Sequence, residues 1–390
     1  MSNDLIILQK KKRNLIIKIL LIILISITIF ILTAFLSFYF FFESKLNKIN
    51  YVGINPNEIT INEGANQNLS SYRNIVLLGL DTREDTYNGS RSDGIMIISI
   101  NQHTNDVKIT SIYRDTYLDI KSTNSNSVYL DKITHAYAYG GAKLSINSLN
   151  RNLDLNIKEF VAVNFPAVVE VVNSIGGINI DIDASEVKYI NRYIDGITKV
   201  TGVSSSHITK PGNYTLDGVQ ALAYCRIRYT DGGDYKRTER MREVLIATFE
   251  KAKTLSIGEL NSLADIILPH ISTNIDKNDI YATIPKILNY NVKESTGFPY
   301  DIKDTTIGGI WYGVPVNLDE NVSRLHYNLF GTENYVPSDT VKNISGQLGT
   351  FLNCPRSVPD CPWSVPDCPR CVPNCPRCVP NCPRSVADCS

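Results

Sequence analysis

Two aspartates and three arginines in the first third of the chain have the residue types needed to bind phosphate groups. Asp81 follows one apolar run, Asp93 stands before a second and Arg114 after a third, with Arg83 and Arg91 between the two aspartates. Carboxylate oxygens hold Mg²⁺ through one or two direct bonds, and guanidinium groups neutralise phosphate charge. The pattern predicts a divalent cation that bridges phosphate oxygens. Aspartates and arginines are also ordinary residues of loops that end strands, so the pattern alone leaves both interpretations open.

Three apolar runs are the elements that must bring these side chains together. Residues 75–80, 95–100 and 107–112 have the composition of buried strands. The short polar connection NQHTND indicates that the last two strands run in opposite directions. If all three alternate, both aspartates and Arg114 fall at the same edge of a sheet.

A second segment combines a glycine pair with a helix-like pattern. Gly140 and Gly141 precede apolar residues at helical spacing, so their backbone amides can face an anion or simply form a tight turn. His135, just before them, fits either a hydrogen-bonded structural histidine or a catalytic base. The sequence does not separate these alternatives.

The third segment, residues 216–245, is rich in arginine. Asp217 is predicted to cap a short helix, and a second helix should bury Met241 and Val244. Arg237 and Arg240 are three residues apart near the start of that helix, where its dipole favours an anion. A solvated charged face is the alternative, but the adjoining DGGD loop offers backbone amides for phosphate. The basic residues here are Arg226, Arg228, Lys236, Arg237, Arg240 and Arg242.

The beginning of the chain predicts a single transmembrane helix. Basic residues between Lys10 and Lys18 precede an uncharged run of 24 residues, 19–42, and about 20 apolar residues are enough to cross a bilayer. The basic side should remain cytoplasmic, which places the rest of the chain outside the cell. A cleaved signal peptide is less consistent with so long a run. The polar residues that follow predict a linker over 43–72.

Composition limits the remaining possibilities. Lys plus Arg and Asp plus Glu each number 39, which argues against coating nucleic acid by bulk charge. Eight of the nine cysteines lie in the last 37 residues, so Cys225 has no partner for a disulfide within the main domain. Those last residues form a seven-residue Cys-Pro repeat whose prolines exclude a continuous helix. A disordered tail is predicted over 351–390, with a disulfide-linked or metal-binding appendage as the alternative.

Six strings in this chain resemble successive motifs of the LytR-CpsA-Psr family. They are LLGLDTR, RSDGIMIISIN, YRDTYLDI, KITHAYAYGG, VNSIGGINIDI and LDGVQALAYCRIRYTDGGDYKRTERMREVL, in the family's order over about half of the chain. The resemblance implies a three-layer α/β/α sandwich with a central mixed sheet. With the anchor, it divides the chain into a cytoplasmic segment (1–18), a transmembrane helix (19–42), a linker (43–72), an extracellular catalytic domain (73–350) and the tail (351–390).

The resemblance also implies a function. Family members transfer an anionic glycopolymer, of teichoic acid or capsule type, from a polyprenyl-pyrophosphate carrier to peptidoglycan, and a hydrophobic pocket takes the polyprenyl chain. Residues 160–182 can line such a pocket or pack in the core. Asp81 and Asp93 match the aspartates that hold Mg²⁺ (or Mn²⁺) and, with Arg114, are the expected catalytic residues. Matching arginines that face the pyrophosphate are Arg83, Arg114, Arg226, Arg228 and Arg240, to which the residue pattern adds Arg91 and Arg237.

This chain departs from the family pattern at two positions. Tyr113 stands where a proline often precedes the Arg-Asp pair, and Met241 stands where a glutamine often follows the last arginine.

Two other functions compete with the transferase. A membrane-bound transcriptional regulator or attenuator needs the basic segment in the cytoplasm, which protease shaving of intact cells tests. A non-catalytic wall-binding protein would lose its function on deletion of the tail.

Overall fold

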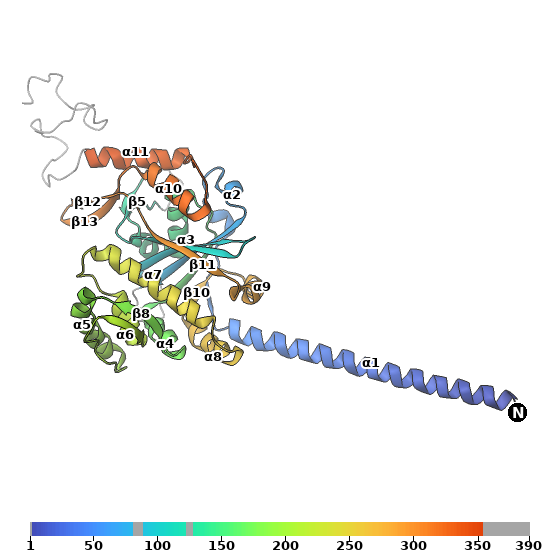
Figure 1. Ribbon diagram of the computed structural model, residues 1–390. Coiled ribbons are helices and arrows are strands. Elements are labelled where there is room, and N and C mark those ends of the chain that lie inside the picture. Colours follow the sequence, from blue (N-terminus) through green and yellow to red (C-terminus); the bar gives the residue numbers. More distant parts are fainter. Residues whose placement is uncertain (1, 81–88, 122–127, 354–390) are drawn as a thin grey trace, which may run out of the picture. The chain divides into compact units, whose positions relative to one another are not determined.

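The computed structural model describes residues 2–80, 89–121 and 128–353 (Figure 1). Asp81, Arg83 and the Cys-Pro tail lie outside the described residues. The chain divides into two compact units, of which the first ends at Ile49 and the second begins at Asn50.

The first unit is one long helix, α1 (Ser2–Leu46). Its part from Arg13 to Leu46 is long and apolar enough to cross a membrane, and the central hydrophobic side chains are exposed, as for Phe30 at 73%. A helix that is apolar on every face has no water-compatible side. The described residues therefore contain one helix that is long and apolar enough to be the predicted membrane span, and the helix itself extends beyond 19–42 at both ends.

The second unit is built around a seven-stranded mixed sheet. The order across this sheet is β1 (Asn50–Tyr51), β10 (Ile271–Thr273), β7 (Glu159–Asn164), β2 (Tyr72–Leu80), β3 (Ser92–Asn101), β4 (Asp106–Ile112) and β11 (Asn291–Phe298). Strand β2 is antiparallel to β3 and parallel to β7, while β4 is antiparallel to β3 and parallel to β11.

The described residues also form three two-stranded sheets. They pair β5 (Tyr117–Asp119) with β6 (Leu130–Lys132), β8 (Ile178–Ile182) with β9 (Gly212–Leu216), and β12 (Ile302–Ile307) with β13 (Ile310–Pro315).

The alternation expected for the first three strands is confirmed. Because β2 and β4 run opposite to β3, the end of β2, the start of β3 and the end of β4 meet at one edge of the sheet. Leu80 at the end of β2 is directly opposite Ser92 at the start of β3. We call this the Asp93 edge.

Helices cover both faces of the sheet and produce two hydrophobic layers (Figure 1). On β3, Ile95 and Ile97 belong to one layer and Met96 to the other, so both faces of the strand are buried. The first layer packs under α3 (Thr134–Leu153), α10 (Leu318–Phe330) and α11 (Asp339–Asn353). The second packs under α4 (Phe165–Ser174), α5 (Ala184–Thr201), α6 (Gly218–Cys225) and α7 (Gly233–Ala252).

This is the expected three-layer α/β/α sandwich. Within residues 160–182, Phe160 packs in the first layer and Val169, Val172 and Ile178 pack in the second. These side chains therefore contribute to the core. The remaining helices are α2 (Ala65–Asn68), α8 (Ile257–Ile267), α9 (Lys277–Ile287) and the short 3₁₀ turns Pro56–Glu58 and Leu268–His270.

The folded domain begins earlier than the predicted residue 73. Strand β1 pairs with β10, and the following residues carry α2. Asn62 is buried, and its amide donates to Asp154 Oδ1 at 2.6 Å and to the carbonyl of Arg151 at 2.9 Å. The polar composition of this segment predicted a linker, but its amides instead pair with buried polar groups of the domain. At the other end, α11 continues to Asn353, just beyond the predicted boundary at 350.

Candidate active site

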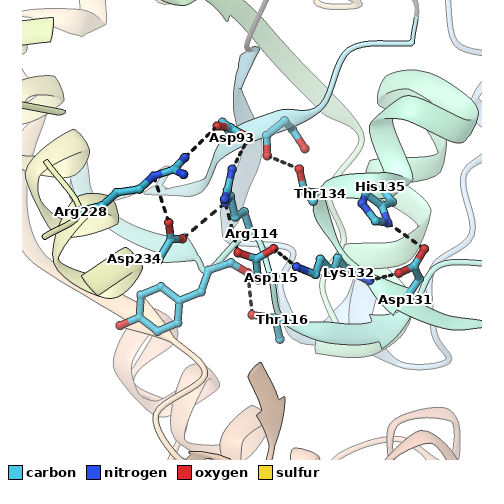
Figure 2. A network of polar contacts seen from close by, with 12 residues as sticks. Asp93, Arg114, Asp115, Thr116, Asp131, Lys132, Thr134, His135, Arg228 and Asp234 are labelled. Atoms are coloured by element: carbon cyan, nitrogen blue, oxygen red, sulfur yellow. Dashed lines mark hydrogen bonds and ion pairs between the residues drawn. The ribbon is translucent and has the colours of Figure 1, made fainter. Parts of the chain in front are cut away.

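Asp93 and Arg114 meet at the Asp93 edge (Figure 2). Asp93 is the second residue of β3, and Arg114 lies two residues beyond β4. The first turn of α3 fixes both strands, because Thr134 donates its hydroxyl to the carbonyl of Ser92 and its amide to that of Arg114, each at 3.0 Å. Arg114 Nη1 then donates to Asp93 Oδ1 at 2.9 Å. The two side chains are 21% and 10% exposed, respectively.

Two arginines from the 216–245 segment converge on the same carboxylate. Arg237 Nη1 lies 3.4 Å from Asp93 Oδ2, and Arg228 Nη2 lies 3.7 Å from the same oxygen. Arg237 is almost fully buried, at 2% exposure, whereas Arg228 is 42% exposed at the mouth of the site. One carboxylate therefore has three guanidinium groups around it, which come from two separate parts of the chain.

Asp234, at the start of α7, is a second carboxylate shared by the same arginines. Its oxygens lie 3.1 Å from Arg237 Nε, 3.6 Å from Arg114 Nε and 3.7 Å from Arg228 Nε. Asp234 is the last residue of the DGGD loop, and no spacing in the sequence indicated that its carboxylate would join the site. We call Arg114, Arg228, Arg237, Asp93 and Asp234 the arginine cluster.

A chain of ion pairs continues from the cluster toward α3. Asp115 Oδ2 lies 3.2 Å from Arg114 Nε, and Asp115 Oδ1 lies 2.7 Å from Lys132 Nζ (Figure 2). Asp131 Oδ2 then lies 2.8 Å from His135 Nδ1 and accepts a hydrogen bond from Tyr139 Oη at 3.2 Å. His135 is therefore hydrogen-bonded, as the structural interpretation expected. No sequence pattern indicated Asp115 or Lys132 as site residues, although Asp115 adjoins Arg114.

The electrostatics of the cluster favour a bound anion. Burial opposes the charge on Arg114, but Asp93, Asp115 and Asp234 together raise its pKa. For Arg237, burial lowers the pKa, Asp234 opposes that effect, and the neighbouring charges of Arg114 and Arg228 add to the lowering. The cluster has three cations and two carboxylates, and Asp115 with Lys132 adds one charge of each sign. A phosphate group would balance the excess positive charge.

The other predicted site residues are placed differently. Arg91 is exposed just before β3. Burial and Asp131 raise the pKa of the Tyr139 hydroxyl, and the charge of Arg91 partly opposes this rise. Arg226 is exposed at the end of α6. Gly140 and Gly141 form a kink inside α3, where Gly141 has a φ of 62°. The glycine pair thus breaks a helix, which agrees with the turn interpretation.

Arg240 does not reach the cluster, contrary to the prediction that it faces pyrophosphate. It is 2% exposed, and its Nε donates to Glu186 Oε1 at 2.7 Å. Its other nitrogens donate to the carbonyl of Ile227 at 3.1 Å and to Thr230 Oγ1 at 2.8 Å. Arg237 and Arg240 diverge because each long side chain reaches a different carboxylate. Arg240 therefore fixes the loop that carries Arg228, and it is a positioning residue.

This role predicts a change in stability. Removing one partner of a buried ion pair leaves an uncompensated charge, so Glu186→Gln should lower the free energy of unfolding by about 3 kcal/mol. Denaturant unfolding measures the change. The double variant Glu186→Gln/Arg240→Met should recover part of the loss, since neither charge is then left alone. An unchanged unfolding midpoint for Glu186→Gln would contradict this account.

The two departures from the family pattern have structural counterparts. The ring of Tyr113 contacts that of Tyr235 in a tilted arrangement, with 4.5 Å between ring centroids and 57° between ring planes. Gly297 leaves room for the Tyr113 hydroxyl, because a Cβ at that position would lie 2.1 Å from the hydroxyl oxygen. The backbone amide of Tyr113 donates to the carbonyl of Phe298 at 3.0 Å, which anchors the residue before Arg114. Met241 is 7% exposed and packs beneath Gly94 at the Asp93 edge.

Asp93 is the one member of the expected metal-binding pair that lies among the described residues. Among them, no group of three or more histidine, cysteine, aspartate or glutamate side chains is arranged to hold a metal ion. Asp93 offers hard oxygen ligands, while the second expected ligand, Asp81, lies outside the described residues. One or two carboxylates are sufficient for Mg²⁺ when substrate phosphates complete its coordination, so the donor chemistry fits that ion.

Comparisons with known proteins agree with this architecture. The model of the LytR_cpsA_psr family matches residues 36–325. A polyisoprenyl-teichoic acid–peptidoglycan teichoic acid transferase, TagT of Bacillus subtilis, is 33% identical over 58% of this chain and 68% of its own length. For some other curated relatives, the aligned part is about three fifths of their length.

Solved structures show the same fold. The crystal structure of B. subtilis TagT is 28% identical, with a TM-score of 0.51 over 68% of this chain and 93% of that one. A structure of TagT bound to LIIa-WTA is also 28% identical, with a TM-score of 0.53 over 68% of this chain and 93% of that one. Both structural similarities therefore extend over nearly the whole of the TagT chain in each structure.

Proposed function

The chain belongs to the LytR-CpsA-Psr family, and on this premise we propose that it is a membrane-anchored phosphotransferase of cell wall assembly. It takes an anionic glycopolymer, of teichoic acid or capsule type, from a polyprenyl-pyrophosphate carrier and links it to peptidoglycan as a phosphodiester. The observation that carries the proposal is the arginine cluster, where Arg114, Arg228 and Arg237 surround Asp93 with an excess of positive charge. The names of relatives such as TagT supply the substrate class.

The cluster suits a displacement at phosphorus. A hydroxyl oxygen of peptidoglycan forms a bond to the phosphorus that bears the glycopolymer, and the bond from that phosphorus to the bridging oxygen breaks. Polyprenyl phosphate leaves, and the hydroxyl proton passes to an aspartate, Asp93 or Asp81. Asp234 also holds the guanidinium groups of Arg114 and Arg237, so both stay in position to stabilise charge on the phosphoryl oxygens when the substrate replaces Asp93 as their partner. Positioning and electrostatics supply most of the rate.

A divalent cation completes the proposed site. Asp81 and Asp93 would hold Mg²⁺ or Mn²⁺ through carboxylate oxygens. When bound, the ion supplies charge neutralisation of the pyrophosphate oxygens. The exposed arginines Arg91 and Arg226 are assigned to the outer part of the pyrophosphate site, where they can attract the anion before it reaches the cluster. Arg83 is also proposed to bind the pyrophosphate.

The proposed location is the outer face of the cell membrane. Helix α1 serves as the single-pass anchor, and the basic residues before it keep the N-terminus in the cytoplasm. A membrane-bound transcriptional regulator would need the opposite topology. Protease shaving of intact cells distinguishes the two, because only an external domain is digested.

Transfer by the purified full-length protein tests the proposal. The protein in detergent is mixed with a polyprenyl-pyrophosphate-linked teichoic acid precursor, radiolabelled in the polymer, and with peptidoglycan. We expect the label to become attached to peptidoglycan through a phosphodiester. Transfer should stop when EDTA is added and resume when Mg²⁺ or Mn²⁺ is supplied. A variant that lacks residues 354–390 should be equally active, whereas a wall-binding protein would depend on the tail. Failure to transfer teichoic acid and capsule precursors alike would refute the proposal.

A further inference from the structure

Three aromatic rings are carried by the two segments that form the arginine cluster and by the hairpin of β12 and β13. Tyr113, Tyr235 and Trp311 form a row in which adjacent ring centroids are 4.5 Å and 6.3 Å apart. Tyr113 directly precedes Arg114, and Tyr235 directly follows Asp234. Trp311 comes from β13, in the part of the chain where the sequence shows no family motif. We call these three residues the aromatic platform.

The hairpin of β12 and β13 is fixed against the site. The amide of Gly313 donates to the carbonyl of Asp115 at 3.1 Å. Gly313 also leaves room for Tyr235, since a Cβ at this position would lie 3.4 Å from Tyr235 Oη and 2.5 Å from Ile302 Cδ1. Tyr235 Oη donates to Asp304 Oδ1 at 2.9 Å, on the strand paired with Gly313. The hydrogen bond of its hydroxyl thus fixes the ring of Tyr235, and Tyr235 and Trp311 both remain partly exposed.

Charged groups lie along the platform. Lys132 Nζ is 2.7 Å from Asp115 Oδ1 in the ion-pair chain of the site, and it also lies 6.0 Å from the centroid of Trp311. Asp304 lies beside Tyr235 on the other strand of the hairpin. The platform therefore combines aromatic faces with hydrogen-bonding groups of both signs. A lipid chain prefers an enclosed apolar pocket, whereas these rings are partly exposed and have the charged groups of Lys132 and Asp304 beside them.

We propose that the aromatic platform binds a pyranose ring of the substrate next to the phosphate that reacts. The proposal rests on the proposed function. One face of a pyranose carries C–H groups that pack on an indole or phenol ring, while its hydroxyl groups point outward and can reach Lys132 and Asp304. Because the platform begins at the residue beside Arg114, a sugar stacked on it lies next to the arginine cluster. The sugar belongs either to the acceptor glycan or to the donor glycopolymer.

The distribution of tryptophan allows a direct binding measurement. The chain has two tryptophans, Trp311 and Trp363, so Trp363→Phe makes Trp311 the only source of indole fluorescence. We expect a saturable change in emission with a peptide-free peptidoglycan tetrasaccharide if the sugar is the acceptor's. A change only with the lipid-linked glycopolymer assigns the platform to the donor. No change with either ligand, or the same change with inorganic pyrophosphate alone, would overturn the proposal.

Kinetics of a second variant supply an independent test. Trp311→Ala should raise the half-saturating concentration of the sugar substrate identified above by about tenfold, equivalent to about 1.4 kcal/mol. Trp311→Phe should restore much of the affinity because it keeps an aromatic face. Affinity for pyrophosphate should not change. Tyr327→Ala, which removes a tyrosine that is 57% exposed on α10, is the matched control. An unchanged half-saturating concentration for Trp311→Ala would contradict sugar binding by the platform. Sugar binding without any transfer would contradict only the proposed function.

Discussion

Arg114→Ala is expected to lower the rate of glycopolymer transfer by roughly 10³-fold, because arginines that stabilise a transferring phosphoryl group contribute on this scale. Arg114 is the side chain that joins the three carboxylates of the site. Its guanidinium lies 2.9 Å from Asp93, 3.2 Å from Asp115 and 3.6 Å from Asp234. Without it, these acids repel both one another and the incoming pyrophosphate. Single-turnover transfer by the purified protein measures the loss.

Two further variants separate charge from geometry. Arg114→Lys keeps the positive charge but lacks the planar fork that contacts several oxygens at once, so it should remain roughly 10²-fold below the wild type. Arg192→Ala, which removes an exposed arginine of α5, is the matched control and should be fully active. Thermal unfolding checks that each variant is folded. Near-normal transfer by folded Arg114→Ala would show that the cluster is not the reaction centre.

The sequence was sufficient to predict how the Asp93 edge is assembled. Alternating apolar runs and one short polar turn determine the directions of β3 and β4, and those directions bring Asp93 to Arg114. The N-cap of α6 also depends only on neighbouring residues, since Asp217 accepts a hydrogen bond from the amide of Gln220 at 2.8 Å. Interactions that depend on a few neighbouring residues can be inferred from patterns, because the same residues that make the contact define the element.

Interactions between distant segments were not predictable in the same way. Arg237 and Arg240 share a helix face, but Glu186, which binds Arg240, lies on another helix more than fifty positions away in the sequence. Lys132 reaches Asp115 only because β5 pairs with β6. Asn62 belongs to a polar stretch, and the groups that accept its amide hydrogens, the carboxylate of Asp154 and the carbonyl of Arg151, lie about ninety positions further along the chain. In each case, the partner comes from packing that no local pattern describes.

Asp93 has one role in the structure and another in the proposed reaction, and its carboxylate cannot perform both with the same partners. In the structure, its two oxygens face Arg114, Arg228 and Arg237, so it acts as an internal counter-ion where an anion would otherwise bind. In the proposed reaction it binds a cation and faces the pyrophosphate. These roles are compatible if the substrate replaces Asp93 as the partner of the arginines while the metal takes the carboxylate.

This exchange makes Asp93→Asn the most informative substitution, because it should separate binding from catalysis. The amide has nearly the same volume, but it neither neutralises the arginines nor holds a divalent cation well. Without metal, the variant should bind inorganic pyrophosphate more tightly than the wild type, by about tenfold, since one unit of repulsion is removed. With Mg²⁺, the wild type should gain affinity and the variant should not, and transfer should fall by roughly 10³-fold. Calorimetric titration with and without Mg²⁺ measures the first two effects. If Mg²⁺ strengthens pyrophosphate binding to Asp93→Asn as much as to the wild type, Asp93 does not hold the metal, and its place in the mechanism must be that of a counter-ion alone.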